Sequence, residues 1–195
     1  IILKINSKFI IMELLKTDSI QKAFKIFIMI FFGTIALTAS AKLKIPFYPV
    51  PMTMQTFVVL FLGIAFGYKI GLATVGVYIL EGIIGIPVFS NSPEKGVGLV
   101  YFTGPTMGYL IGFFSAVFFA GYLNLKSNIF MIFIKLTFAV STIYLLGILW
   151  LGTLIGWDKP ILQLGFTPFL LAELFKICLL TLLTKKILNF KNLPR

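Results

Sequence analysis

A carboxylate and an ammonium group near the C-terminus are the side chains of this sequence best suited to hold a polar ligand. Glu173 and Lys176 lie three positions apart in an apolar run, so on a helix both project from one face. Ionisable groups are costly in hydrocarbon, where they mark ligand sites or transport pathways. Together the pair offers an acceptor and a donor to a polar ligand. A self-neutralising ion pair without a ligand is the alternative interpretation.

Two further features are candidates for the same site. Glu81 lies in another apolar run, one to two helical turns before Pro87. The stretch 87–103 is the longest loop that we expect, and its mixture of aromatic, amide, basic and glycine residues is typical of a lid or binding loop. We expect this loop to contribute four residues to the site: Phe89, Asn91, Lys95 and Tyr101. Lys135, also within an apolar run, is expected to reach the membrane border with its long side chain.

The composition excludes most enzymatic chemistry. The chain has no histidine, which removes histidine bases, His-metal sites and histidine-activated nucleophiles. Its single cysteine, Cys178, excludes an internal disulfide, and no phosphate-binding G-x-x-x-x-G-K-[ST] loop occurs. We therefore predict a protein that is not an enzyme and has neither a metal site nor a cofactor. Any uphill transport must draw its energy from a partner or a gradient.

Hydropathy places the chain in a membrane. Of its 195 residues 59% are hydrophobic and 12% are charged, whereas soluble domains have about 45–50% and about 25%. The mean hydropathy is +1.04. Apolar stretches come near the roughly 17–25 residues that cross a bilayer. We predict an all-α integral membrane protein with a bundle of six transmembrane helices at residues 24–41, 52–67, 69–86, 104–123, 129–153 and 164–188.

The predicted spans define one membrane domain at residues 24–190. We expect residues 1–23 to form a cytoplasmic or interfacial segment and residues 191–195 a cytoplasmic tail. Met12 offers an alternative start, so residues 1–11 either precede the translated chain or extend the interfacial segment. The second span is short, and its first turn carries the polar residues Thr53, Gln55 and Thr56, so we expect it to begin at an aqueous cavity.

The basic residues predict the orientation of the spans. Eleven of them fall on the side of the two termini, and four fall on the other side: Lys42, Lys44, Lys95 and Lys159. Because cytoplasmic loops carry the excess of lysine and arginine, both termini are predicted to be cytoplasmic. The net charge of +11 then reflects topology and contact with anionic lipid, and no nucleic-acid partner is expected. A signal peptide ending at 39–41 is the rival interpretation, but the apolar run exceeds the usual core of about 7–15 residues.

Small residues recur at helical spacing in two of the predicted spans. In the fourth span they stand at every fourth position from 104 to 120, which lets helix backbones approach closely in lipid. We expect this stripe to pack inside the bundle. The first span carries a second stripe, Gly33, Ala36 and Ser40, which either packs internally or receives a partner helix.

Three runs of the sequence carry a family resemblance. They are Pro49-Val50-Pro51-Met52-Thr53-Met54-Gln55-Thr56, Gly85-Ile86-Pro87-Val88-Phe89 and Gly104-Pro105-Thr106-Met107-Gly108-Tyr109-Leu110-Ile111-Gly112-Phe113. In this order they resemble the BioY family, the biotin-binding S components of energy-coupling factor (ECF) transporters. The resemblance extends from about Phe24 to Lys176.

The resemblance implies a six-helix S component in the plasma membrane that captures biotin from outside. It further implies a transmembrane coupling protein and two ATP-binding subunits as partners, with Gly33, Ala36 and Ser40 docking the coupling protein. The family's last helix reads Pro-Phe-Leu-x-Gly-Asp-x-x-Lys, in which Glu173 here replaces the aspartate and Lys176 keeps the lysine. The family's loop arginine is absent, and Lys95 is the nearest cation for the carboxylate of biotin.

Two alternatives remain at this point. An S component for a different vitamin would have similar helices, and a structural subunit of a membrane complex would need Glu173 and Lys176 only as an ion pair. Biotin binding to the purified protein separates the first interpretation from both.

Overall fold

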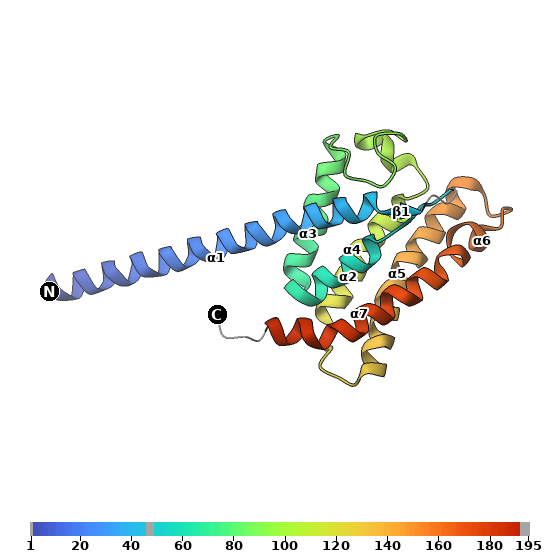
Figure 1. Cartoon of the computed structure of the whole chain (residues 1–195). Helices are drawn as coiled ribbons and strands as arrows, with labels where there is room; N and C mark the ends of the chain where they lie inside the picture. Colours follow the sequence, from blue (N-terminus) through green and yellow to red (C-terminus); the bar gives the residue numbers. More distant parts are fainter. Residues whose placement is uncertain (1, 46–48, 192–195) are drawn as a thin grey trace.

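The chain folds into helices joined by short connections, and its computed structural model describes residues 2–45 and 49–191 (Figure 1). Side chains are described from residue 19 to residue 44 and from 49 to 189. The predicted tail at 191–195 lies outside these residues except for Lys191. The long helices are α1 (Ile2–Lys42), α2 (Gln55–Phe66), α3 (Tyr68–Ile83), α4 (Met107–Tyr122), α5 (Ile129–Ile155) and α7 (Leu170–Lys191).

Shorter elements fill the connections. Two strands, β1 (Lys44–Ile45) and β2 (Met52–Thr53), pair antiparallel between α1 and α2. The 3₁₀ helix η1 (Gly98–Thr103) precedes α4, and α6 (Ile161–Gly165) with the 3₁₀ helix η2 (Thr167–Phe169) precedes α7. The all-α class is therefore confirmed.

Each predicted span overlaps one of the six long helices, with shifted ends. Helix α1 begins far upstream of residue 24, and α7 begins at Leu170 rather than at residue 164, because α6 and η2 occupy the preceding residues. Three regions of the described chain are long and apolar enough to cross a membrane: Ser19–Lys42, Ile129–Ile155 and Ile161–Asn189. Helices α2 and α4 are apolar but shorter, so the count of six spans stays a prediction.

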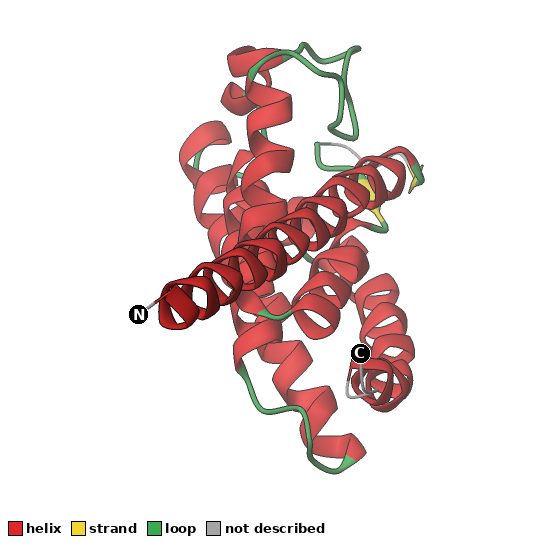
Figure 2. Cartoon of the chain, turned by 90° about the vertical axis from the view of Figure 1, so that its left-hand side faces the viewer, coloured by secondary structure: helices red, strands yellow, loops and turns green. Residues whose placement is uncertain are grey.

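Helix α4 packs against α2, α3 and α5. Figure 2 shows the bundle from the side of the N-terminus, with the long helix α1 in front. The small residues of the α4 stripe make its packing possible. A side chain at Gly112 would place its Cβ 2.6 Å from the Cα of Ile143 in α5, and one at Gly63 in α2 would place it 2.7 Å from the carbonyl oxygen of Val117. The stripe thus packs internally, as expected.

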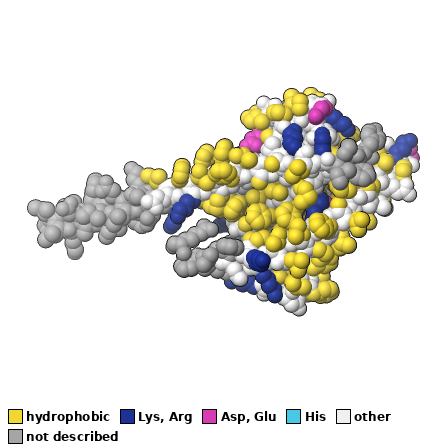
Figure 3. All heavy atoms as spheres, viewed as in Figure 1, with side chains coloured by type: hydrophobic (Ala, Val, Ile, Leu, Met, Phe, Trp, Pro, Cys, Tyr) yellow, Lys and Arg dark blue, Asp and Glu magenta, His cyan; other side chains and the backbone are white. Residues whose placement is uncertain are grey.

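The surface fits an apolar surrounding. Large hydrophobic side chains are exposed along α1, where Phe24, Phe27 and Phe32 are each more than 60% exposed. In Figure 3 hydrophobic side chains cover most of one face, and most of its basic side chains lie toward the edges. The opposite face of α1 packs on α2 and α3.

Candidate functional site

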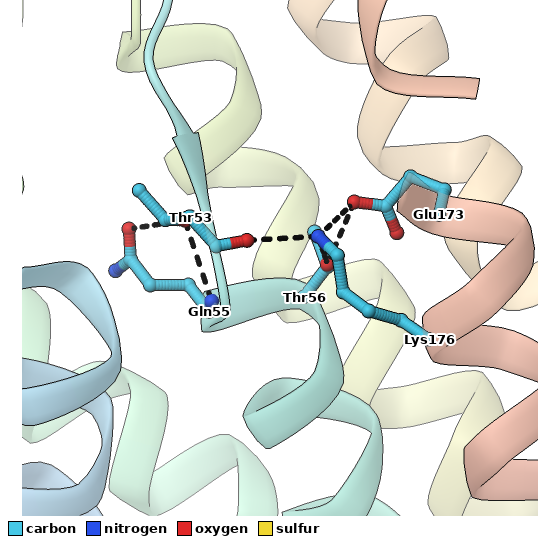
Figure 4. A network of polar contacts seen from close by, with 5 residues as sticks. All are labelled: Thr53, Gln55, Thr56, Glu173 and Lys176. Atoms are coloured by element: carbon cyan, nitrogen blue, oxygen red, sulfur yellow. Dashed lines mark hydrogen bonds and ion pairs between the residues drawn. The ribbon is translucent and has the colours of Figure 1, made fainter. Parts of the chain in front are cut away.

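The first turns of α2 and α7 meet in a buried polar network (Figure 4). The carboxylate of Glu173 and the ammonium of Lys176 form an ion pair in which the side chains are only 8% and 5% exposed. Lys176 Nζ also donates to the backbone oxygen of Thr53 at 2.8 Å and to Thr56 Oγ1 at 2.9 Å. Thr56 Oγ1 in turn donates to Glu173 Oε1 at 2.9 Å. Two threonines of α2 and its preceding strand thus hold the pair.

The two carboxylate oxygens of Glu173 differ in their surroundings. Oε1 accepts from both Lys176 and Thr56, whereas Oε2 is buried and accepts no hydrogen bond of regular geometry from the residues that the structure describes. The hydroxyl of Tyr144 in α5 also interacts with this carboxylate. An ammonium has three donors, and those of Lys176 already reach Thr53, Thr56 and Glu173. The network therefore leaves one strong acceptor open and no free donor on Lys176. The sequence had suggested that each residue would supply one ligand bond.

A cavity lies beside this network and encloses about 540 Å³, part of it open to solvent. Polar residues of the second span line it at one side, namely Thr53, Gln55 and Thr56. A cavity was expected at the start of that span. Glu173 is the one carboxylate among the lining residues, all of which the structure describes.

Aromatic rings form the apolar part of the cavity wall. Phe89 and Tyr101 stack with their ring centroids 4.6 Å apart, and both line the cavity. Tyr109 of α4 and Tyr144 of α5 line it from the opposite helices and pack edge to face at 5.9 Å. Flat rings of this kind bind the faces of a ligand ring system, while the few polar groups fix its orientation.

A second set of hydrogen bonds positions the loop that covers the cavity. Gln55 Nε2 donates to Tyr78 OH at 2.8 Å, and Tyr78 OH donates to the backbone oxygen of Val88 at 3.1 Å. The side chain of Ser90 lies 3.3 Å from Tyr101 OH. Side chains of α2 and α3 therefore hold the segment next to Phe89 through hydrogen bonds.

Two lysines hold the same loop from the outside. Lys42 Nζ donates to the backbone oxygens of Phe89 at 2.8 Å and Ser92 at 2.7 Å. Lys44 Nζ donates to the backbone oxygen of Ser90 at 2.7 Å and to Asn91 Oδ1 at 3.2 Å. In the sequence these lysines counted only as charges on the outer side. Because each contact joins residues almost fifty positions apart in the sequence, no local sequence pattern could predict them.

The structure brings together only part of the predicted ligand set. Three of the predicted residues line the cavity: Glu173, Phe89 and Tyr101. Lys176 is not part of the lining but forms the ion pair with Glu173. The remaining three predicted residues are not part of the lining either. Lys95 is exposed on the loop, Asn91 is half-buried and accepts from Lys44, and Glu81 is half-buried on α3.

The stripe predicted to dock a partner is split by the fold. Gly33 is buried, and a Cβ there would lie 2.5 Å from Thr74 Cγ2 of α3. Ser40 is 4% exposed and donates to the backbone oxygen of Leu37. Ala36 alone of the three is exposed. Gly33 and Ser40 therefore belong to internal packing, which was the other interpretation of this stripe.

The sequence model of the BioY family matches residues 12–192. The chain belongs to the BioY family.

Among the described residues no group of three potential metal ligands occurs. Two tyrosines of the cavity wall escaped the sequence-based prediction, although Tyr109 stands within one of the family-like runs. Apart from that run, nothing in the sequence indicated that the ring of Tyr109 lies in the cavity wall.

Curated BioY proteins resemble the chain over most of their length. A probable biotin transporter BioY of Pyrococcus horikoshii is 31% identical over 154 residues, which cover 78% of this chain and 90% of that protein. The biotin transporter BioY of Thermotoga maritima is 34% identical over 155 residues, covering 79% and 90%.

A solved structure shares the fold. The S component for biotin from an ECF-type ABC transporter superposes with a TM-score of 0.73, covering 87% of this chain and 93% of that one at 24% identity. The helix arrangement is thus that of an S component.

Proposed function

We propose that this protein is the substrate-binding membrane subunit of a biotin uptake transporter. The observation that carries the proposal is the open carboxylate oxygen Oε2 of Glu173, buried beside an aromatic cavity in a member of the BioY family. Two relatives that this chain matches over nine-tenths of their length are named biotin transporters, one of them as probable.

The chemistry of biotin fits this arrangement. Its ureido ring carries two N–H donors, and a buried carboxylate oxygen without a partner is a strong acceptor for one of them. Lys176 and Thr56 hold the other oxygen of Glu173 and so fix the direction in which Oε2 points. The apolar part of the ligand's fused rings packs against Phe89, Tyr101 and Tyr144.

The proposal includes an arrangement in the plasma membrane. Six helices at residues 24–190 cross the bilayer, both termini are cytoplasmic, and the loop at 84–97 and the turn at 156–160 face outward. The split of the basic residues supports this orientation. Biotin then enters from outside, because the cavity lies between that loop and the first turns of α2 and α7.

The proposal also includes the partners of an ECF transporter. A transmembrane coupling protein and ATP-binding subunits would supply the energy, in keeping with the missing phosphate-binding loop of this chain. The structural relative is an S component from an ECF-type transporter, which supports this assignment. We propose that the exposed face of α1 around Ala36 contacts the coupling protein.

Biotin binding to the purified chain in detergent tests the function. We expect saturable binding of one biotin, with no binding of a vitamin that lacks a ureido ring, such as thiamine or riboflavin. Binding of another vitamin in place of biotin would redirect the assignment within the S components. Binding of none would favour a structural subunit.

A further inference from the structure

The cavity contains a carboxylate but no cation of its own. Glu173 is the one charged side chain among its lining residues, and Lys176 spends its three donors inside the polar network. A ligand that carries a carboxylate, as biotin does, needs a positive charge at the end remote from Glu173. Lys95, the cation expected from the sequence, is exposed on the loop and outside the lining.

Two other exposed ammonium groups, which are also outside the lining, contact residues of the cavity wall directly. Lys42 and Lys44 reach the loop at 89–92 and contact residues that line the cavity, Phe89 and Ser90. Their acceptors are backbone carbonyls, a hydroxyl and an amide. In the part of the chain that the structure describes, neither ammonium lies within 4.0 Å of a carboxylate. Among the described residues neither lysine therefore forms an ion pair, although the charge of Glu94 acts on Lys42 from a greater distance.

The donor count separates the roles of these two lysines. Lys42 Nζ contacts the backbone oxygens of Phe89 and Ser92 and the hydroxyl of Ser92, so its three donors are used. Lys44 Nζ contacts only the backbone oxygen of Ser90 and Asn91 Oδ1 among the described residues. An ammonium has three donors, so one donor of Lys44 remains for a ligand.

The strand pair brings Lys44 close to the cavity as well. Lys44 of β1 lies directly opposite Thr53 of β2, and Thr53 lines the cavity. Side chains of such cross-strand partners share one face of the ribbon, with their Cβ atoms about 4.5–5.5 Å apart. Thr53 also accepts from Lys176 through its backbone oxygen. The same strand thus connects the two ends of the site.

We propose that Lys44 binds the carboxylate of the ligand and that Lys42 is a positioning residue, which holds the cavity loop in place. The inference rests on the proposed function, because it names the residue that recognises the anionic end of the ligand. Since Lys44 already donates to Ser90 and Asn91, binding of the carboxylate to its third donor joins the ligand to the covering loop. A negatively charged end then favours the closed arrangement of the loop.

A comparison of biotin with biotin amide, its uncharged carboxamide, tests the assignment at low ionic strength. We expect the parent protein to prefer biotin at least about tenfold, because the amide oxygen can still accept a hydrogen bond from the ammonium but carries no charge to pair with it. Lys44→Gln should remove most of this preference, and Lys44→Arg should keep it. The exposed outer lysine Lys159 offers a matched control, since Lys159→Gln removes an equal charge and should leave the preference intact.

Lys42→Gln should weaken the binding of biotin and of biotin amide by the same factor, because it releases the loop but leaves the contact between Lys44 and the carboxylate. For a Lys44→Gln variant that binds neither compound, Lys44→Cys in a Cys178→Ser background gives a second measurement. An aminoethyl thiosulfonate reagent restores the ammonium there and should restore the preference, whereas a methyl thiosulfonate reagent should not.

Three results would overturn the role of Lys44 while leaving the proposed function standing. They are a parent that binds both compounds equally, a Lys44→Gln variant that keeps the preference, and a loss of the preference in Lys95→Gln instead. A parent that binds neither compound would refute the proposed function itself.

Discussion

Removing the charges of Glu173 and Lys176, singly and together, separates a ligand site from a structural ion pair. In Glu173→Gln the new side chain keeps one oxygen for Thr56 and Lys176, but its amide group stands where Oε2 was. A donor then faces the N–H donors of biotin. The loss of a hydrogen bond to a charged acceptor costs about 1.5–3 kcal/mol, so we expect affinity to fall by at least about 2 kcal/mol, roughly thirtyfold.

The single variants should differ in stability. Breaking a buried ion pair on one side costs about 3–5 kcal/mol when the remaining charge is left without compensation. In Glu173→Gln the ammonium of Lys176 keeps three oxygen acceptors, whereas in Lys176→Met the carboxylate of Glu173 loses its countercharge and keeps, among the described residues, hydroxyl partners such as Thr56. We therefore expect Lys176→Met to be the less stable of the two, and its binding loss to be at least as large.

The double variant decides between the two interpretations. When Glu173→Gln and Lys176→Met are combined, neither position carries a buried charge, and stability should return close to that of the parent while biotin affinity stays low. Thermal unfolding and size exclusion in detergent measure the first quantity, and equilibrium binding of biotin measures the second. Asp158→Asn is the matched control, because the pair that Asp158 forms with Lys159 is largely exposed and such pairs contribute about 0–1 kcal/mol. A double variant that binds biotin like the parent would show that the pair is structural.

Two other predictions concern the membrane arrangement. Cysteines at the exposed positions Glu94 and Asn189, with Cys178 replaced, should react with an impermeant reagent from opposite sides, and labelling from one side would contradict the topology. Because Ala36 is exposed, Ala36→Leu should reduce copurification with the coupling protein and leave biotin binding unchanged. Gly33→Leu should instead lower stability, because its side chain would clash with Thr74. Loss of biotin binding in Ala36→Leu would indicate that Ala36 packs internally.

The sequence predicted those parts of the fold that depend on local periodicity. Hydropathy located each long helix, and the four-residue spacing of Gly108 and Gly112 predicted a stripe that packs inside the bundle, which the structure places against α5. Glu173 and Lys176 could be paired because three positions on a helix place side chains together in any surroundings. The start of α2 was predicted to border a cavity because the span is short and begins with polar residues.

The parts that the sequence did not predict depend on contacts between distant segments. The conformation of the loop at 84–97 is held by Lys42, Lys44 and Tyr78, which belong to other elements. Without these contacts Lys95 appeared to be the nearest cation. The split of the stripe at Gly33, Ala36 and Ser40 likewise follows from the side on which α3 packs against α1, which helical spacing alone does not specify.

The placement of Glu173 explains why a costly arrangement persists in this bundle. A buried acceptor without a partner costs about 1–3 kcal/mol, and more when it is charged. Lys176 and Thr56 neutralise and orient the carboxylate, yet they approach only one of its two oxygens. A purely structural ion pair would be more stable with both oxygens satisfied. Under the proposed function the remaining oxygen is the acceptor for an N–H donor of the ligand, and a ligand that supplied this hydrogen bond would stabilise the fold on binding.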